Sequence, residues 1–153
     1  MNTAPRRILV VEDDAACRET LCAILLEAGY RPLASDRPVS PVDVQQLRAD
    51  LIVTDLMMHG EPEGHAWLEA LRGWRWTADL PILVCSGFLA EDAPAAIRVR
   101  ALATATLPKP FELDAFLHAV EECLAAPIAP VSLPLYATSS IVIPPTLDDR
   151  PAA

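Results

Sequence analysis

Four groups of polar residues in this 153-residue chain each follow directly on a segment that we expect to be a β-strand. Clustered carboxylates repel one another unless a cation joins them, and a hard divalent ion such as Mg2+ prefers oxygen ligands. A phosphoryl group would match an ammonium and a hydroxyl placed opposite that ion. Brought together, these groups could therefore bind a divalent cation and a phosphoryl group. In chain order they are Glu12-Asp13-Asp14, Asp55, Ser86-Gly87 and Lys109-Pro110.

The segments between these groups predict the elements that must position them. Short apolar runs rich in β-branched residues are typical of buried parallel strands, and they alternate with stretches of helical periodicity from residue 7 to about 126. This alternation predicts an α/β fold, a doubly wound five-stranded parallel sheet with helices on both faces. The expected strands are 8–11, 31–34, 51–54, 81–85 and 103–107, and the expected helices are 14–28, 42–47, 64–73, 93–102 and 112–124.

The expected sheet brings the four polar groups to one place. In an open parallel sheet, ligands bind outside the carboxyl ends of the strands, and all four groups stand at such ends. Pro108 would remove a donor from the hydrogen-bond ladder, so the fifth strand is expected at an edge of the sheet. Carboxylates, a hydroxyl and an ammonium should therefore converge on a single rim.

Composition limits the partners. Twelve basic and twenty-one acidic residues give a net charge of −9, which argues against nucleic acid or an anionic membrane as a partner. The four cysteines have no metal-ligand spacing and, with no export signal, indicate reduced thiols in the cytoplasm. Residues 127–153 contain six prolines and three charged residues, so we expect a domain over 1–126 followed by an apolar, proline-rich tail.

The motifs ILVVEDD, LIVTDLMM, ILVCSG and LPKPF, in this order and at these separations, resemble the receiver domain of bacterial two-component response regulators. The resemblance covers about residues 6–126 and implies the flavodoxin-like (βα)5 receiver fold. It also implies that Asp55 is the phosphoacceptor, which takes a phosphoryl group from a histidine kinase or a phosphotransfer protein. Ser86 matches the hydroxyl that binds the phosphoryl oxygen and Lys109 the ammonium that pairs with it, with a cis peptide bond before Pro110.

The same resemblance implies a Mg2+ site. Asp13 and Glu12 match the acidic pair that holds the ion, with Glu12 acting through water. Asp55 and the backbone carbonyl of Met57 would complete the protein ligands. For Asp14, capping the first helix is the favoured role over metal binding.

The chain departs from the family pattern in three places. His59 stands four residues after Asp55, where the family usually has proline. Gly64 opens the third helix one residue later than usual, so the loop between them is rebuilt. Thr106 stands where an aromatic switch residue is common, three residues before Lys109. We expect His59, like His65 and His118, to face solvent.

These observations favour a single-domain response regulator that signals by protein contact or acts as a phosphoryl shuttle; whether it forms a homodimer stays open. It would be a signalling protein and no enzyme beyond its own phosphoryl transfer and dephosphorylation. The alternative, motivated by Thr106 and the altered loop, is a scaffold that works without phosphorylation. A haloacid-dehalogenase-type phosphatase also uses an aspartate at a strand end, but it needs a second aspartate where this chain has Met57.

Overall fold

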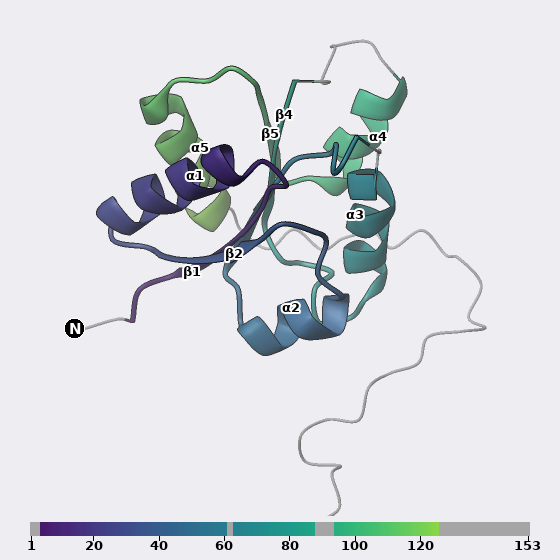
Figure 1. The fold of residues 1–153 in the computed structure, drawn as a ribbon. Helices are drawn as coiled ribbons and strands as arrows, with labels where there is room; N and C mark the ends of the chain where they lie inside the picture. The colour runs from purple at the N-terminus through teal and green to yellow at the C-terminus, as the bar shows by residue number, and fades with distance from the viewer. Residues whose placement is uncertain (1–3, 61–62, 88–93, 126–153) are drawn as a thin grey trace, which may run out of the picture.

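A computed structural model describes residues 4–60, 63–87 and 94–125 of the chain, and the expected tail lies outside them. Strands and helices alternate along the sequence (Figure 1). The strands are β1 (Arg7–Val11), β2 (Arg31–Ser35), β3 (Leu51–Thr54), β4 (Ile82–Ser86) and β5 (Ala105–Pro108). The helices are α1 (Ala15–Glu27), α2 (Pro41–Leu47), α3 (Glu63–Gly73), α4 (Pro94–Leu102) and α5 (Leu113–Ala125).

The five strands form one parallel sheet in the order β2-β1-β3-β4-β5, which confirms the expected doubly wound fold. β1 and β3 are neighbours in the centre, with Val11 opposite Thr54. β5 lies at an edge, as Pro108 predicts. Since all strands run the same way, the residues that follow β1, β3, β4 and β5 emerge at one rim.

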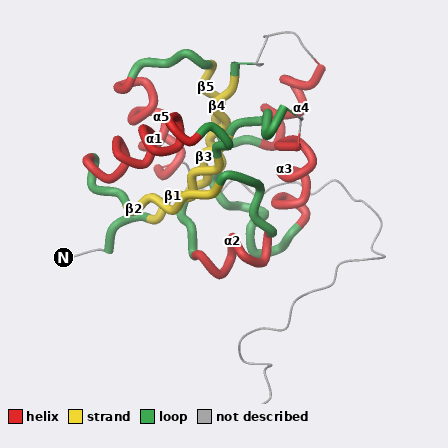
Figure 2. Tube along the Cα trace, in the orientation of Figure 1, coloured by secondary structure: helices red, strands yellow, loops and turns green. Residues whose placement is uncertain are grey.

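Helices cover both faces of the sheet (Figure 2), and an apolar layer lies between the sheet and the helices on each face. α1 and α5 cover one face, where Leu25 and Phe116 are fully buried. α3 packs on the other face, where Leu68 and Leu71 are fully buried, and α2 and α4 lie on the same side. β1, β3 and β4 contribute side chains to both layers, which explains why their sequences are apolar without alternation.

The predicted elements all occur, and none of their ends differs from expectation by more than two residues. α1 begins at Ala15 because Asp14 is its N-cap, accepting a hydrogen bond from the N–H of Cys17 at 2.7 Å. α2 begins at Pro41, one residue earlier than expected, after the cap Ser40. β5 begins two residues later than expected, since the hydroxyl of Thr104 accepts from the N–H of Ile82 at 3.0 Å.

Within the described residues, no helix combines the length and apolar character needed to cross a bilayer.

Candidate phosphoacceptor and cation site

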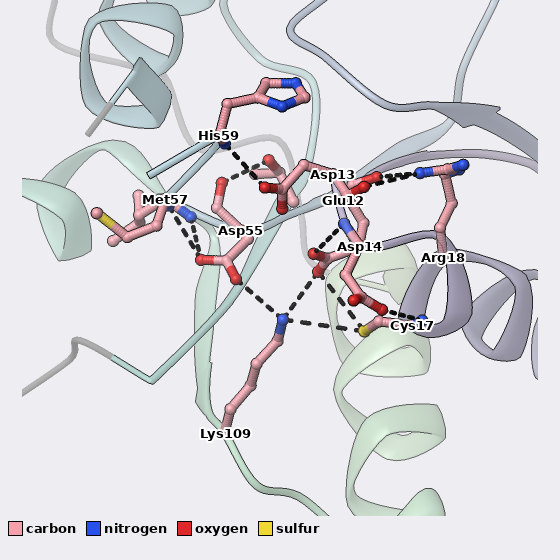
Figure 3. A network of polar contacts seen from close by, with 11 residues as sticks. Glu12, Asp13, Asp14, Cys17, Arg18, Asp55, Met57, His59 and Lys109 are labelled. Carbon is pink, nitrogen blue, oxygen red and sulfur yellow. Dashed lines mark hydrogen bonds and ion pairs between the residues drawn. The ribbon is translucent and has the colours of Figure 1, made fainter. Parts of the chain in front are cut away.

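The expected site residues meet at the carboxyl ends of the central strands (Figure 3). Glu12 and Asp13 follow β1, and Asp55 follows β3 on the neighbouring strand. The N–H of Asp55 donates to the carbonyl of Val11 at 3.4 Å, so the ladder continues up to the acidic residues. Lys109 reaches the same place from the end of β5.

Lys109 joins the two acidic strand ends. Its Nζ lies 2.8 Å from Oε2 of Glu12 and 2.9 Å from Oδ2 of Asp55. The side chains of Glu12 and Asp55 are only 5% and 13% exposed, so both charges need a partner. Burial lowers the pKa of Lys109, but the hydrogen bonds to Glu12 and Asp55 outweigh it and raise the pKa above its ordinary value. Lys109 is therefore a fixed cation in the site.

The two oxygens of Asp55 have different partners. Oδ1 accepts from the backbone N–H groups of Leu56 at 2.6 Å and Met57 at 3.1 Å. Oδ2 faces the ammonium of Lys109. A carboxylate oxygen with two N–H donors has both lone pairs engaged, whereas an oxygen with one donor keeps a lone pair for another electrophile.

Asp13 is held from a different loop. Its Oδ2 accepts from the backbone N–H of His59 at 2.8 Å, and this bond holds the pKa of Asp13 below its ordinary value. The guanidinium of Arg18 donates to the carbonyl oxygens of Glu12 at 2.7 Å and Asp13 at 3.3 Å. The peptide that carries both acids is thus fixed by α1, while the carboxylate of Asp13 is oriented from the loop after β3.

Ser86 and Lys109 come from adjacent strands at the other side of the site. Ser86 is fully buried at the end of β4, and its carbonyl accepts from the N–H of Lys109 at 3.1 Å. The peptide bond between Lys109 and Pro110 is cis, as expected from the resemblance. Thr106 is half-buried on β5 opposite Val84.

Three groups that contact the candidate site residues were not identified from the sequence. Arg18 lies one turn beyond the acidic cluster, which is a signal that could have been used, since a helix turn brings i+4 residues back over its start. The second is Cys17, whose Sγ lies 3.6 Å from Oε2 of Glu12 and 3.9 Å from the Nζ of Lys109. Burial raises the pKa of the Cys17 thiol most, and the negative charge of Glu12 raises it further. The third is the backbone N–H of His59, for which side-chain patterns give no signal.

Of the three histidines that we expected to face solvent, two do so. His59 is exposed although its backbone serves the site, and the side chain of His118 is 70% exposed. His65 differs, because its side chain is only 28% exposed on α3.

The donor chemistry fits a hard divalent cation. The carboxylates of Asp13 and Asp55 stand at the carboxyl ends of the neighbouring strands β1 and β3, and the N–H of Met57 donates to Asp55. Among the described residues, no three His, Cys, Asp or Glu side chains are close enough together to form a ready-made metal cage. Mg2+ does not require such a cage, because it usually keeps several waters and takes one or two carboxylates from the protein.

Comparison with known proteins decides the family. A family model described as the response regulator receiver domain matches residues 8–121. The chain belongs to the receiver domain family. Receiver domains work in two-component systems, in which they interact with histidine kinases or phosphotransfer proteins.

Curated relatives of this receiver differ in length. It is 34% identical over 122 residues to the phosphate regulon transcriptional regulatory protein PhoB of Escherichia coli (strain K12), covering 75% of this chain and 51% of that protein. The chain thus spans about half the length of this relative. It is 32% identical over 128 residues to the response regulator receiver protein CpdR of Brucella abortus (strain 2308), covering 79% of this chain and 98% of that protein.

Solved structures show the same fold. The chemotaxis protein CheY4 of Vibrio cholerae matches this receiver with a TM-score of 0.68 and 25% identity over 78% of this chain and 99% of that one. The receiver domain of sensor histidine kinase PA1611 from Pseudomonas aeruginosa PAO1 matches with a TM-score of 0.70 and 19% identity over 80% and 100%. That neighbour has a magnesium ion coordinated in its active site cleft.

Proposed function

We propose that this receiver accepts a phosphoryl group on Asp55 from a histidine kinase or phosphotransfer protein, in a Mg2+-dependent reaction, and signals by contact with another protein. The observation that carries the proposal is the position of the Lys109 ammonium, 2.8 Å from Glu12 and 2.9 Å from Asp55. It places a fixed positive charge beside Asp55, the aspartate that directly follows the central strand β3.

Asp55 Oδ2 is the proposed nucleophile. Oδ1 has both lone pairs engaged by the N–H groups of Leu56 and Met57, so Oδ2 is the oxygen with a lone pair to give. Oδ2 forms a bond to phosphorus as the bond between phosphorus and the donor's imidazole nitrogen breaks, and the imidazole keeps that electron pair. The product is an aspartyl phosphate, from which water later removes the phosphoryl group.

Lys109 and Ser86 bind the transferred group. In phosphoryl transfer, negative charge spreads over the equatorial oxygens, so positioning and charge neutralisation do most of the work. Lys109 can turn from Asp55 to a phosphoryl oxygen while it still contacts Glu12. Ser86, at the end of the adjacent strand β4, would donate its hydroxyl to another phosphoryl oxygen.

Glu12, Asp13, Asp55 and the carbonyl of Met57 would hold Mg2+, with Glu12 acting through water. Asp55 could bind both the ion and phosphorus through Oδ2, because Lys109 leaves a second lone pair on Oδ2 when it turns to a phosphoryl oxygen. A bound divalent cation neutralises negative charge on the phosphoryl oxygens. Asp13 carries the strongest support as a direct ligand, since its carboxylate is already oriented and its pKa lies below the ordinary value. The magnesium ion in the cleft of the PA1611 receiver domain supports the same choice of cation.

Labelling with acetyl phosphate and Mg2+, read by intact mass, tests the proposal. The wild type should gain one phosphoryl group, and Asp55→Asn and metal-free samples should gain none. Glu112→Gln, an exposed acid before α5, is a matched control that should label like the wild type. Equal labelling of Asp55→Asn and the wild type would exclude Asp55 as the acceptor.

A one-domain arrangement, with residues 1–126 as receiver and 127–153 as a tail, is part of the proposal. The alignment that covers 98% of CpdR supports a receiver as a working unit by itself. A scaffold that works without phosphorylation is the second candidate, favoured by Thr106 at the usual aromatic position on β5. Labelling of the wild type with no change in partner binding would favour the scaffold.

A further inference from the structure

The loop after β3 has a backbone conformation that the usual family residue could not adopt. His59 has φ of 52° and Gly60 has φ of 78°. Proline has φ fixed near −65° and no backbone N–H. Histidine is among the non-glycine residues that tolerate a left-handed conformation best. The exchange of proline for His59 therefore gives this loop both a new shape and a new hydrogen-bond donor.

The backbone and the side chain of His59 both make polar contacts. Its backbone N–H donates to Oδ2 of Asp13 at 2.8 Å, and its ring Nε2 lies 3.1 Å from the carbonyl oxygen of Asp36 (Figure 3 shows the first contact). Asp13 follows β1 and Asp36 follows β2. His59 thus connects the loop of the phosphoacceptor, after β3, with the segments that follow β1 and β2.

We propose that the backbone N–H of His59 is a positioning group for the cation site: it holds the Asp13 carboxylate in the orientation that binds Mg2+, and the imidazole anchors the loop on Asp36. An oxygen that accepts one N–H keeps a lone pair, so orientation and cation binding are compatible. Groups that orient a metal ligand contribute strongly to affinity. The inference rests on the proposed function, because it requires Asp13 to be a Mg2+ ligand.

The test measures Mg2+ binding by calorimetry, without a phosphodonor, on the full chain. His59→Pro removes the N–H and forbids the left-handed φ, so its affinity should fall about 10–100-fold, the usual effect of losing an orienting partner. His59→Asn keeps the N–H and tolerates the same φ but loses the ring, so its affinity should fall less. Equal losses in the two variants, with melting temperatures like the wild type, would assign the effect to the ring and overturn the proposal.

A semisynthetic chain with an ester in place of the amide between Met58 and His59 isolates the donor, because it removes only the N–H. It also decides the question if His59→Pro fails to fold. We expect its Mg2+ affinity to fall about tenfold or more. Equal affinity of the ester chain and the wild type would overturn this inference alone. A wild type that binds no Mg2+ would overturn the proposed function and this inference with it.

Discussion

Asp13 and Asp14 are adjacent acids with different environments. The side chain of Asp14 accepts from the N–H of Cys17 at the start of α1, and that of Asp13 accepts from the N–H of His59 in the loop after β3. Asp14→Ala should lower the free energy of unfolding by about 1 kcal/mol, as the loss of a helix cap does, with Mg2+ affinity retained. Asp13→Ala should abolish Mg2+ binding in calorimetry. The reverse pattern would show that Asp14 is the ligand.

Lys109 should stabilise the metal-free chain through Glu12 and Asp55. Removing one partner costs about 3–5 kcal/mol for a buried ion pair and up to about 1 kcal/mol for an exposed one. The Lys109 side chain is 25% exposed, so we expect Lys109→Met to lose about 1–3 kcal/mol in urea unfolding with EDTA. Added Mg2+ should restore part of this loss, because a cation that binds only the folded chain stabilises it.

The pH dependence of this contribution has a definite sign. The pKa of Lys109 is raised in the folded chain, so its stabilisation is complete below the ordinary pKa of 10.5 and is lost as the pH rises through the higher folded value. Arg6→Met is the control, since Arg6 and Asp50 form an exposed pair at 3.7 Å. A loss no larger than that of the control at neutral pH would contradict the role given to Lys109.

Arg72 joins α3 to the end of α4 and to the connection that leads to β4. From the last turn of α3 it donates to the carbonyls of Thr77 at 3.3 Å, Ala78 at 3.0 Å and Leu80 at 2.7 Å, in the connection to β4. Its Nε donates to the carbonyl of Leu102 at the end of α4 at 2.8 Å. Burial lowers the pKa of its guanidinium below the ordinary value, so this is a charged group held inside by backbone oxygens.

Arg72→Met should therefore leave four carbonyl groups without this donor. We expect a loss of about 2–4 kcal/mol in urea unfolding, with Mg2+ affinity unchanged, because each hydrogen bond to a charged group contributes about 1.5–3 kcal/mol and neighbouring losses do not add fully. Arg75→Met is a matched control, since Arg75 is exposed and its guanidinium lies 5.1 Å from the ring centroid of Trp76. Similar losses in both variants would show that the buried contacts carry no special weight.

The sequence was sufficient to predict the strands and which residues follow them, for a physical reason, but it did not indicate the side chains of Cys17 and Arg18. β1, β3 and β4 are continuously apolar, and parallel pairing brings whatever follows them to one rim. What it could not show are bonds made by the backbone. The N–H of His59 and the carbonyls bound by Arg18 and Arg72 depend on loop conformation, which the identity of the residues does not specify.

At the scale of the whole molecule, the role of the proline-rich tail, residues 127–153, stays a prediction. It combines Leu133, Leu135, Tyr136 and residues 141–143 with three charged residues, and exposed apolar surface costs about 25 cal/mol per Å2. We therefore expect it to dock on its own domain or on a second chain. Truncation after Ala126 should lower the melting temperature, change the mass in solution or reduce solubility. Three unchanged measurements would show that the tail is only a linker.

The common direction of the strands also separates charge along the molecule. Arg6, Arg7, Arg31 and Arg48 stand at or before the beginnings of β1, β2 and β3, and the acids of the site stand beyond their ends. We therefore expect an electric dipole parallel to the strands with the phosphoacceptor toward its negative pole, reduced by Asp50 at one end and by Lys109 at the other. At low ionic strength this dipole should turn the acidic rim toward a positively charged partner before the surfaces touch, within a Debye length of about 10 Å at 0.1 M salt.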